Sequence, residues 1–129
     1  MLPRLSNVPQ LNHVVSDYLN ELQKQHFEGD IASNYADRLS LATDNSVYQQ
    51  LPQAILFPKS VADVVRITKL ANKEKYLQLT FTPRGGGTGT NGQSINNNII
   101  VDLSRHMTGI LELNIEERWV RVQAGVVKD

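Results

Sequence analysis

Cysteine is absent from the 129 residues, and the charges cancel. Without cysteine this stretch can hold no disulfide bond, no thiol nucleophile and no cysteine-ligated zinc or iron–sulfur centre. Lys plus Arg (13) and Asp plus Glu (13) give a formal net charge of zero. A general nucleic-acid binder normally carries a basic excess, so we expect no nucleic-acid partner.

Long apolar segments are also missing. No uninterrupted apolar run approaches the roughly 18 residues that suggest a transmembrane helix. The first seven residues, MLPRLSN, lack the apolar core of a signal peptide. We therefore predict a cytoplasmic protein without a transmembrane segment, and leave peripheral association with a membrane open.

The first fifty residues are predicted to form a helical lead-in over 1–50. Residues 1–9 contain two prolines and show no period. A helix is expected at about 10–25, because apolar residues recur there with helical spacing. This stripe, which we expect to face a core, comprises Leu11, Val14, Val15, Tyr18, Leu19 and Leu22. Short helical turns and loops are expected over 30–50.

A strand, a helix and a second strand follow. Residues 54–57 form a compact apolar run closed by Pro58, which predicts a buried strand. Ser60 followed by Asp63 resembles a capping box and predicts a helix to about Asn72. Alternation over 77–81 predicts a strand. This order indicates a βαβ unit with a parallel strand pair and a right-handed crossover.

The last part of the chain is predicted to be β-rich. Residues 99–103 are a third strand candidate. Residues 110–113 and 119–123 alternate on either side of the connection 114–118, which predicts a hairpin. A lone hairpin is marginal in water, and no element follows to cover it. We therefore expect an α+β fold in which 51–129 is the first, truncated part of a longer domain.

Glycines are concentrated in one segment. Five of the 8 glycines lie between Gly85 and Gly92, between two predicted strands. Glycine permits positive φ and close approach of a ligand, and successive N–H groups can converge on phosphate oxygens. The candidate ligand-binding residues are Arg84, Gly85, Gly86, Gly87, Thr88, Gly89, Thr90 and Asn91. We expect this loop to be mobile without ligand; a plain linker or a hinge are the alternatives.

Two common phosphate motifs do not fit the segment. Gly89 is followed by Thr90 and Asn91, not by the Lys of a Walker loop. A G-x-G-x-x-G match at Gly87, Gly89 and Gly92 leads into the turn-rich residues 93–98 and then a strand. A dinucleotide fingerprint of the Rossmann type requires a helix at that point.

The order of these motifs resembles a known family. The segments PRGGGTG (83–89), IIVDLSR (99–105) and VRVQAGV (120–126), with FPKSVADV (57–64) upstream, look like the FAD-binding domain of the FAD-linked oxidases of the vanillyl-alcohol-oxidase type. The resemblance runs from about 52 to 129. Residues 30–50 resemble the lead-in of the D-lactate and D-2-hydroxyglutarate dehydrogenase branch. The N-terminus is most similar to large bacterial members that join the flavin domain to an iron–sulfur domain far downstream.

The resemblance implies a two-lobed FAD-binding domain, with the small parallel βαβ lobe and the first antiparallel strands of the second lobe in this chain. The amides of Gly85 to Gly89 would hold the FAD pyrophosphate, and Thr88, Thr90 and Asn91 are side-chain candidates. Some relatives tether the flavin to a His at the position matching Thr88, so FAD is expected to be noncovalent here. An iron–sulfur cluster would belong to the part beyond residue 129.

The implied reaction is oxidation of a D-2-hydroxy acid, of the 2-hydroxyglutarate or lactate type, by hydride transfer to flavin N5. The substrate-binding groups and the base of such relatives lie beyond residue 129, so this chain is expected to hold no catalytic residue. The electron acceptor is left unspecified, and a homo-oligomer is left open. The alternative is a non-enzymatic nucleotide- or anion-binding module complete in itself.

Other chemistry-bearing residues favour structural roles. The three histidines are scattered without the spacing of a helical metal site, so no metal site is predicted. Asp102 is expected to be a strand-end residue bonded to a nearby loop, and Trp119 a hairpin residue. For Arg84 three roles are open: a charge partner for phosphate, support for the loop, or a structural salt bridge.

Overall fold

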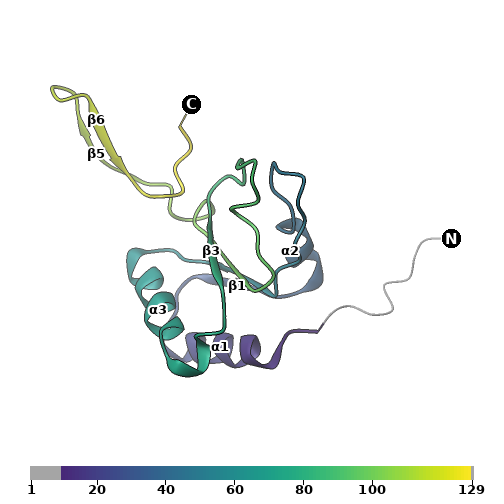
Figure 1. Cartoon of the computed structure of the whole chain (residues 1–129). Helices are drawn as coiled ribbons and strands as arrows, with labels where there is room; N and C mark the ends of the chain where they lie inside the picture. The colour runs from purple at the N-terminus through teal and green to yellow at the C-terminus, as the bar shows by residue number, and fades with distance from the viewer. Residues whose placement is uncertain (1–9, 129) are drawn as a thin grey trace.

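A computed structural model describes residues 10–128 (Figure 1). Its main sheet has four strands in the order β1-β2-β4-β3. These strands are β1 (Asp30–Ala32), β2 (Ala54–Phe57), β3 (Phe81–Arg84) and β4 (Ile99–Asp102). β4 pairs in parallel with both β2 and β3, while β1 is antiparallel to β2. The predicted α+β class is confirmed. The irregular segment predicted for 1–9 lies outside the described residues.

In residues 10–128 three α-helices and one 3-10 helix accompany the sheet: α1 (His13–Lys24), α2 (Tyr35–Ser40), α3 (Val61–Ala71) and η1 (Glu74–Tyr76). Helix α1 begins where the Asn12 side chain accepts a hydrogen bond from Val14 N–H at 2.9 Å, which satisfies one of the free donors at a helix start. Within the described residues no helix is long and apolar enough to cross a membrane.

The core lies on both faces of β2. Because side chains alternate along a strand, Ala54 and Leu56 join the cluster built with α1 and α3, while Ile55 and Phe57 join a smaller cluster on the opposite face. Val15, Tyr18, Leu19 and Leu22 of α1 are buried, which confirms the predicted helix and its core-facing stripe. The prediction of a buried strand at 54–57 is confirmed as well.

Tyr18 joins α1 to α3 and to the sheet. Its hydroxyl donates to the Ile67 carbonyl at 2.9 Å, and burial raises the pKa of Tyr18 above its ordinary value. Its ring centroid lies 5.2 Å from that of Tyr76 and 5.1 Å from that of Phe81, within the range of favourable aromatic pairs. A helix, a turn and a strand therefore share one aromatic cluster.

The predicted capping box is only partly formed. Ser60 Oγ accepts from Asp63 N–H at 3.2 Å, so the expected N-cap of α3 is present. The Asp63 carboxylate, however, accepts from the backbone N–H groups of Lys59 and Glu28, each at 3.0 Å, and from Arg66 at 2.9 Å. Asp63 is fully buried, so it ties the segment before β1 to the start of α3.

The strand predicted at 77–81 was wrong. Backbone hydrogen bonds from Leu77 N–H to Glu74 O and from Leu79 N–H to Tyr76 O hold this stretch in turns, and β3 begins only at Phe81. The sequence alternates apolar and polar residues here as a strand does, but Leu77 is exposed whereas Leu79 is buried, and a strand would place both on one face. β3 contains Pro83, which lacks an N–H for pairing and is tolerated because β3 is an edge strand.

Two further expectations were wrong in detail. β2 and β3 are parallel but not adjacent, because β4 lies between them. Residues 30–50 contain the strand β1 besides turns and α2. Both α1 and β1 pack with elements that follow residue 51. The domain boundary at 50/51 stays a prediction.

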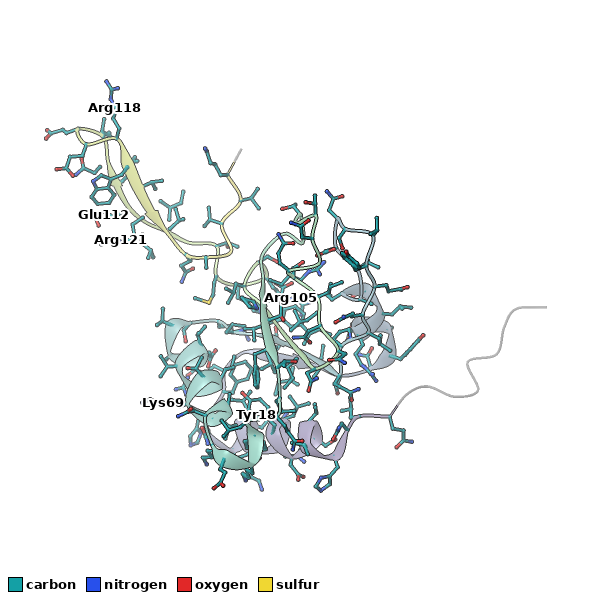
Figure 2. The ribbon with its side chains drawn as sticks, viewed as in Figure 1. Tyr18, Lys69, Arg105, Glu112, Arg118 and Arg121 are labelled. Carbon is teal, nitrogen blue, oxygen red and sulfur yellow. The ribbon has the colours of Figure 1, made fainter. Side chains whose placement is uncertain are left out.

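The predicted hairpin is confirmed. β5 (Ile110–Asn114) and β6 (Trp119–Val122) pair antiparallel and extend away from the sheet (Figure 1). Arg121 and Glu112 form a cross-strand ion pair at 2.8 Å, and the labelled Arg118 lies at the far tip (Figure 2). Ile110, Leu111 and Leu113 are largely exposed, so this apolar surface has no cover within the described residues.

Glu21 links α1 to the segment around η1. Its carboxylate accepts from the Tyr76 hydroxyl at 2.8 Å and pairs with Lys73 and Lys75. The bond to Lys73, followed by those to Lys75 and Tyr76, lowers the pKa of Glu21 from 4.5 to about 2. A carboxyl group with a depressed pKa in the folded state stabilises the fold above its unfolded pKa, and this stabilisation is lost as the pH falls.

We expect Glu21→Gln to lower the melting temperature at pH 6, and the difference from wild type to vanish between about pH 4.5 and pH 2. Thermal unfolding measured across this range checks it. The control is Asp17→Asn, which removes the exposed partner of His13 on the same helix and should change the melting temperature little. A difference for Glu21→Gln that is independent of pH would contradict the assignment.

Candidate functional site

The glycine-rich loop starts at the carboxyl end of β3. Residues 85–98 connect β3 to its parallel neighbour β4, and carboxyl ends of parallel strands are where ligands of open α/β sheets bind. The loop does not stand alone: a second loop, which follows α2, projects beside it (Figure 1). The Asn45 N–H donates to the Gly87 carbonyl at 3.0 Å across the two loops.

The first part of the loop has backbone amides without a hydrogen-bond acceptor among the described residues. In the part of the chain that the structure describes, the N–H groups of residues 85 to 90 donate to no protein acceptor, whereas Asn91 N–H donates to Gln93 Oε1 at 3.0 Å. Exposed amides of consecutive glycine-rich residues are the donors that form anion-binding concavities. The loop therefore offers a run of donors to a ligand rather than to the chain itself.

The glycines fall into two groups. Gly87 has φ 66° and Gly92 has φ 73°, a left-handed conformation that glycine adopts without cost. A Cβ at Gly87 would also lie 2.4 Å from Arg84 Nη2. At Gly85 a Cβ would meet nothing within 4 Å, and at Gly86 only Thr88 Cγ2 at 3.6 Å. The chain itself therefore does not exclude side chains at 85 and 86, and their absence leaves the peptide open to a ligand.

The Arg84 side chain contacts two parts of the glycine-rich loop. Its guanidinium donates to the Ser94 carbonyl at 3.5 Å and lies against Gly87. Over residues 10–128 Arg84 forms no ion pair with an acidic side chain. Of the three roles left open by the sequence, the structure shows support for the loop, and contact with a phosphate stays a prediction.

A shallow polar cleft of about 450 Å³, largely open to solvent, lies between the two loops. One wall is Arg84, Gly87 and Thr88, and the other is Ser40, Thr43, Asp44 and Asn45. The structure thus brings three of the eight predicted residues into this cleft. Gly85, Gly86, Thr90 and Asn91 lie in the outer, exposed part of the loop, and Gly89 packs over the Gln93 side chain.

The second wall was missed from the sequence. The Thr43–Ser46 tetrapeptide is polar and typical of a turn, but nothing in its composition indicates that it returns to the glycine loop. A bridge between Thr43 and Gln49 and a bond from Gln50 N–H to Ala42 O at 2.9 Å close the base of this loop. The strand β1, which sets the path of the chain into α2, was not predicted from the sequence either. Without that strand, the position of this loop could not be inferred.

Asp44 is the acidic group of the cleft. Its Oδ1 accepts from Ser46 N–H and its Oδ2 from Ser94 Oγ, both at 2.9 Å. The bond from Ser46, and then those from Ser94, hold the pKa of Asp44 below its ordinary value. The ionised carboxylate is therefore occupied by donors from its own loop and from the glycine-rich loop.

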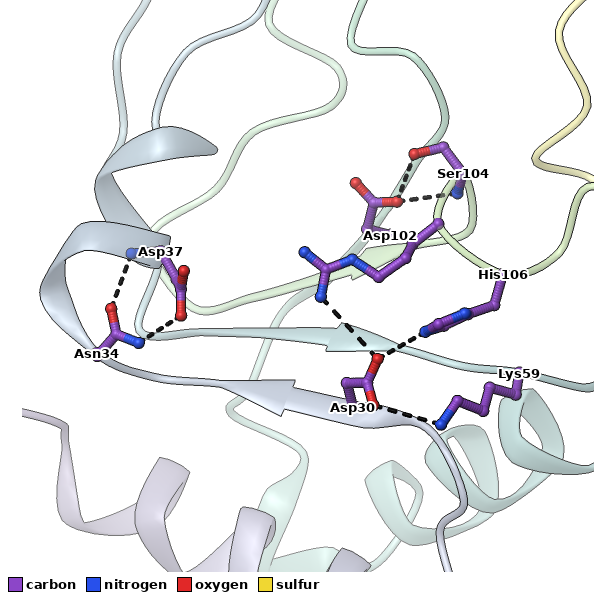
Figure 3. Close-up of polar contacts among 8 residues, drawn as sticks. Asp30, Asn34, Asp37, Lys59, Asp102, Ser104 and His106 are labelled. Atoms are coloured by element: carbon purple, nitrogen blue, oxygen red, sulfur yellow. Dashed lines mark hydrogen bonds and ion pairs between the residues drawn. The ribbon is translucent and has the colours of Figure 1, made fainter.

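The remaining candidates have structural partners. Asp102 Oδ1 accepts from Ser104 N–H at 2.9 Å and Ser104 Oγ at 2.7 Å, which confirms a strand-end role. His106 lies 2.6 Å from Asp30, with Lys59 on the same carboxylate (Figure 3); the bond to His106 is the main cause of a lowered Asp30 pKa.

Trp119 Nε1 donates to Glu117 at 2.6 Å within the hairpin, which confirms its predicted place there. Among the described residues no group of three His, Cys, Asp or Glu side chains could hold a metal ion.

Comparison with known proteins agrees with this geometry. The family described as an FAD binding domain matches residues 52–129. The chain is 81% identical over 129 residues to D-2-hydroxyglutarate dehydrogenase of Haemophilus influenzae and 58% identical to that of Escherichia coli, covering all of this chain and 13% of each relative. The chain thus spans about an eighth of the length of these relatives.

Among solved structures, alkyldihydroxyacetonephosphate synthase superposes with a TM-score of 0.75 at 20% identity, over 93% of this chain and 25% of that one. At this identity the likeness shows a shared fold. The family match over residues 52–129, more than half of the chain, establishes that the chain belongs to the FAD binding domain family.

Proposed function

We propose that this chain is the FAD-binding part of a dehydrogenase that oxidises a D-2-hydroxy acid, with D-2-hydroxyglutarate as the substrate. The name of the relatives that match the whole chain supports the substrate. The observation that carries the cofactor role is the run of unused amides from Gly85 to Thr90. They follow the carboxyl end of β3. They include the amides of Gly85 and Gly86, where the fold leaves room for a side chain.

A diphosphate fits this loop. Hydrogen bonds to a charged group contribute roughly 1.5–3 kcal/mol each, and amides that donate to no protein acceptor can bond a ligand without first breaking a bond. In our proposal the amides of Gly85 to Gly89 grip the diphosphate of FAD, and Thr88, Thr90 and Asn91 add side-chain donors. Thr88 offers no imidazole for a covalent bond to the flavin, so the cofactor is held noncovalently.

The flavin, when bound, supplies the acceptor for a hydride from the substrate. The chain itself binds the cofactor and orients it, and we assign no catalytic residue to it. Any iron–sulfur cluster of the protein has its cysteine ligands outside these residues, because the 129 residues contain no cysteine. We propose a cytoplasmic location and leave the electron acceptor and the oligomeric state unassigned.

The first test removes the open approach at Gly86. In the full chain, Gly86→Ala and Gly86→Val should raise the dissociation constant for FAD in order of side-chain size, by about tenfold or more for Val. Loss of one hydrogen bond to a charged group, about 1.5–3 kcal/mol, corresponds to at least that factor. Titration of apoprotein with FAD measures it.

The matched control is Gly109→Ala, which places a methyl group about 3.0 Å from Gln123 Oε1, at the start of the hairpin rather than in the glycine-rich loop. FAD affinity should be unchanged in this variant. If Gly86→Val bound FAD as tightly as Gly109→Ala, the loop would not be the cofactor site.

Gly87 should respond differently from Gly86. Gly87→Ala forces a side chain into the left-handed region and against Arg84, so we expect about 1–2 kcal/mol lower stability of the apoprotein. Gly86→Ala meets no such obstacle and should leave stability nearly unchanged. Denaturant unfolding of the two apoproteins checks this, and equal stability would contradict the division of the glycines.

The substrate assignment has its own test. The full protein should be yellow as purified, and its flavin absorbance should bleach without oxygen when D-2-hydroxyglutarate is added, but not with the L enantiomer. A colourless protein that takes up no FAD would contradict the proposed function. Bleaching by D-lactate alone would overturn the assignment of D-2-hydroxyglutarate.

A further inference from the structure

The loop formed by residues 43–48, which we call the strut loop, makes two hydrogen bonds with the glycine-rich loop. Asn45 N–H donates to the Gly87 carbonyl at 3.0 Å, and Ser94 Oγ donates to Asp44 Oδ2 at 2.9 Å. These bonds reach the glycine-rich loop before and after its exposed tip. Both join residues about 40 to 50 positions apart in the chain.

The two contacts act on the part of the loop that shapes the donor run. Gly87 is in the left-handed conformation, and a bond to its carbonyl fixes the orientation of the peptide between Gly87 and Thr88. Ser94 is buried and its carbonyl also accepts from Arg84. Arg84 and Asp44 therefore both hold Ser94, one through its backbone and one through its hydroxyl.

The strut loop is itself braced. Asp44 Oδ1 accepts from Ser46 N–H at 2.9 Å, and the base of the loop is closed by the Thr43–Gln49 bridge. Tyr48 lies against Gly92, where a Cβ would come within 3.1 Å of its ring. A braced loop can restrain the glycine-rich loop, whereas a free loop would only move with it.

We propose that the strut loop is a positioning element of the cofactor site: through Asp44 and Asn45 it holds the glycine-rich loop in the form that binds a diphosphate. This inference rests on the proposed function and adds residues that the glycine motif does not contain. Ordering a residue costs on the order of 1–2 kcal/mol, so restraint by the protein leaves less of that cost to the ligand. Apparent affinity falls in proportion to the fraction of protein in the binding-competent form.

A simpler role for Asp44 has to be separated from this one. A carboxylate that lines a cleft for a diphosphate repels it, and on that account removing Asp44 would improve binding. The two roles predict opposite changes in the affinity for FAD when Asp44 is replaced. As a strut, Asp44 is needed because its oxygens bond Ser46 and Ser94; as a bare charge, it is a hindrance.

The experiment compares Ser94→Ala, Asp44→Ala and the control Ser60→Ala in the full chain. Ser60→Ala also removes a single hydroxyl that makes one side-chain hydrogen bond, the N-cap of α3, and costs about 1 kcal/mol of stability. FAD affinity is measured by titration of the apoprotein, and stability by thermal unfolding. Hydrogen exchange of the Asn45 amide in apoprotein reports the contact with Gly87 directly.

We expect Ser94→Ala and Asp44→Ala each to raise the dissociation constant for FAD about tenfold and to speed exchange of the Asn45 amide. Ser60→Ala should lower the melting temperature but leave the dissociation constant for FAD and the exchange rate of the Asn45 amide unchanged. Tighter binding by Asp44→Ala, or affinities of both strut variants equal to that of Ser60→Ala, would overturn the inference. Wild-type protein that binds no FAD would instead overturn the proposed function, so the two failures are distinct.

Discussion

The pairing of β4 between β2 and β3 is the constraint on which the site depends. The register sets Phe81 opposite Ile99 and Arg84 opposite Asp102, so β3 and β4 begin and end at the same positions along the sheet. The glycine-rich loop must then leave the carboxyl end of β3 and return to the amino end of β4. β4 is buried throughout, and its burial anchors an otherwise exposed loop to the core of the fold.

The strut loop is placed by the same sheet. β1 pairs antiparallel with β2, and α2 and the strut loop follow it toward the end where the glycine-rich loop emerges (Figure 1). Buried Arg38 of α2 donates to the Pro52 carbonyl at 2.7 Å, which links α2 to the chain just before β2. Residues before position 51 therefore line the polar cleft together with the glycine-rich loop, although the glycine motif itself lies wholly in the later part.

The sequence predicted the elements whose signals are local. The stripe of α1, the N-cap Ser60, the apolar strands β2 and β4 and the hairpin all follow from short-range patterns. It failed where a pattern had two explanations. The alternation of apolar and polar residues over 77–81 is typical of a strand, yet residues 77–79 lie in turns. β1 is only three residues long, too short for a periodic signal. Insertion of β4 between β2 and β3 depends on long-range pairing, which no local pattern encodes.

The candidate site shows the same division. The segment from Gly85 to Gly92 stands out as a candidate ligand loop because its glycine enrichment is visible in the sequence. Asp44, Asn45 and Ser94 do not stand out, since each is an ordinary polar loop residue until the fold brings it to the glycine-rich loop. The structure also separates glycines required by the backbone, such as Gly87, from glycines such as Gly86, where the fold leaves room for a side chain.

The central claim is that the amides of Gly85 to Thr90 bind the diphosphate of FAD. An experimental structure of the full chain with FAD bound tests it most directly. We predict that phosphate oxygens lie within about 2.7–3.2 Å of several of these nitrogens. A structure in which the diphosphate is held by other residues, with these amides facing solvent, would contradict the account.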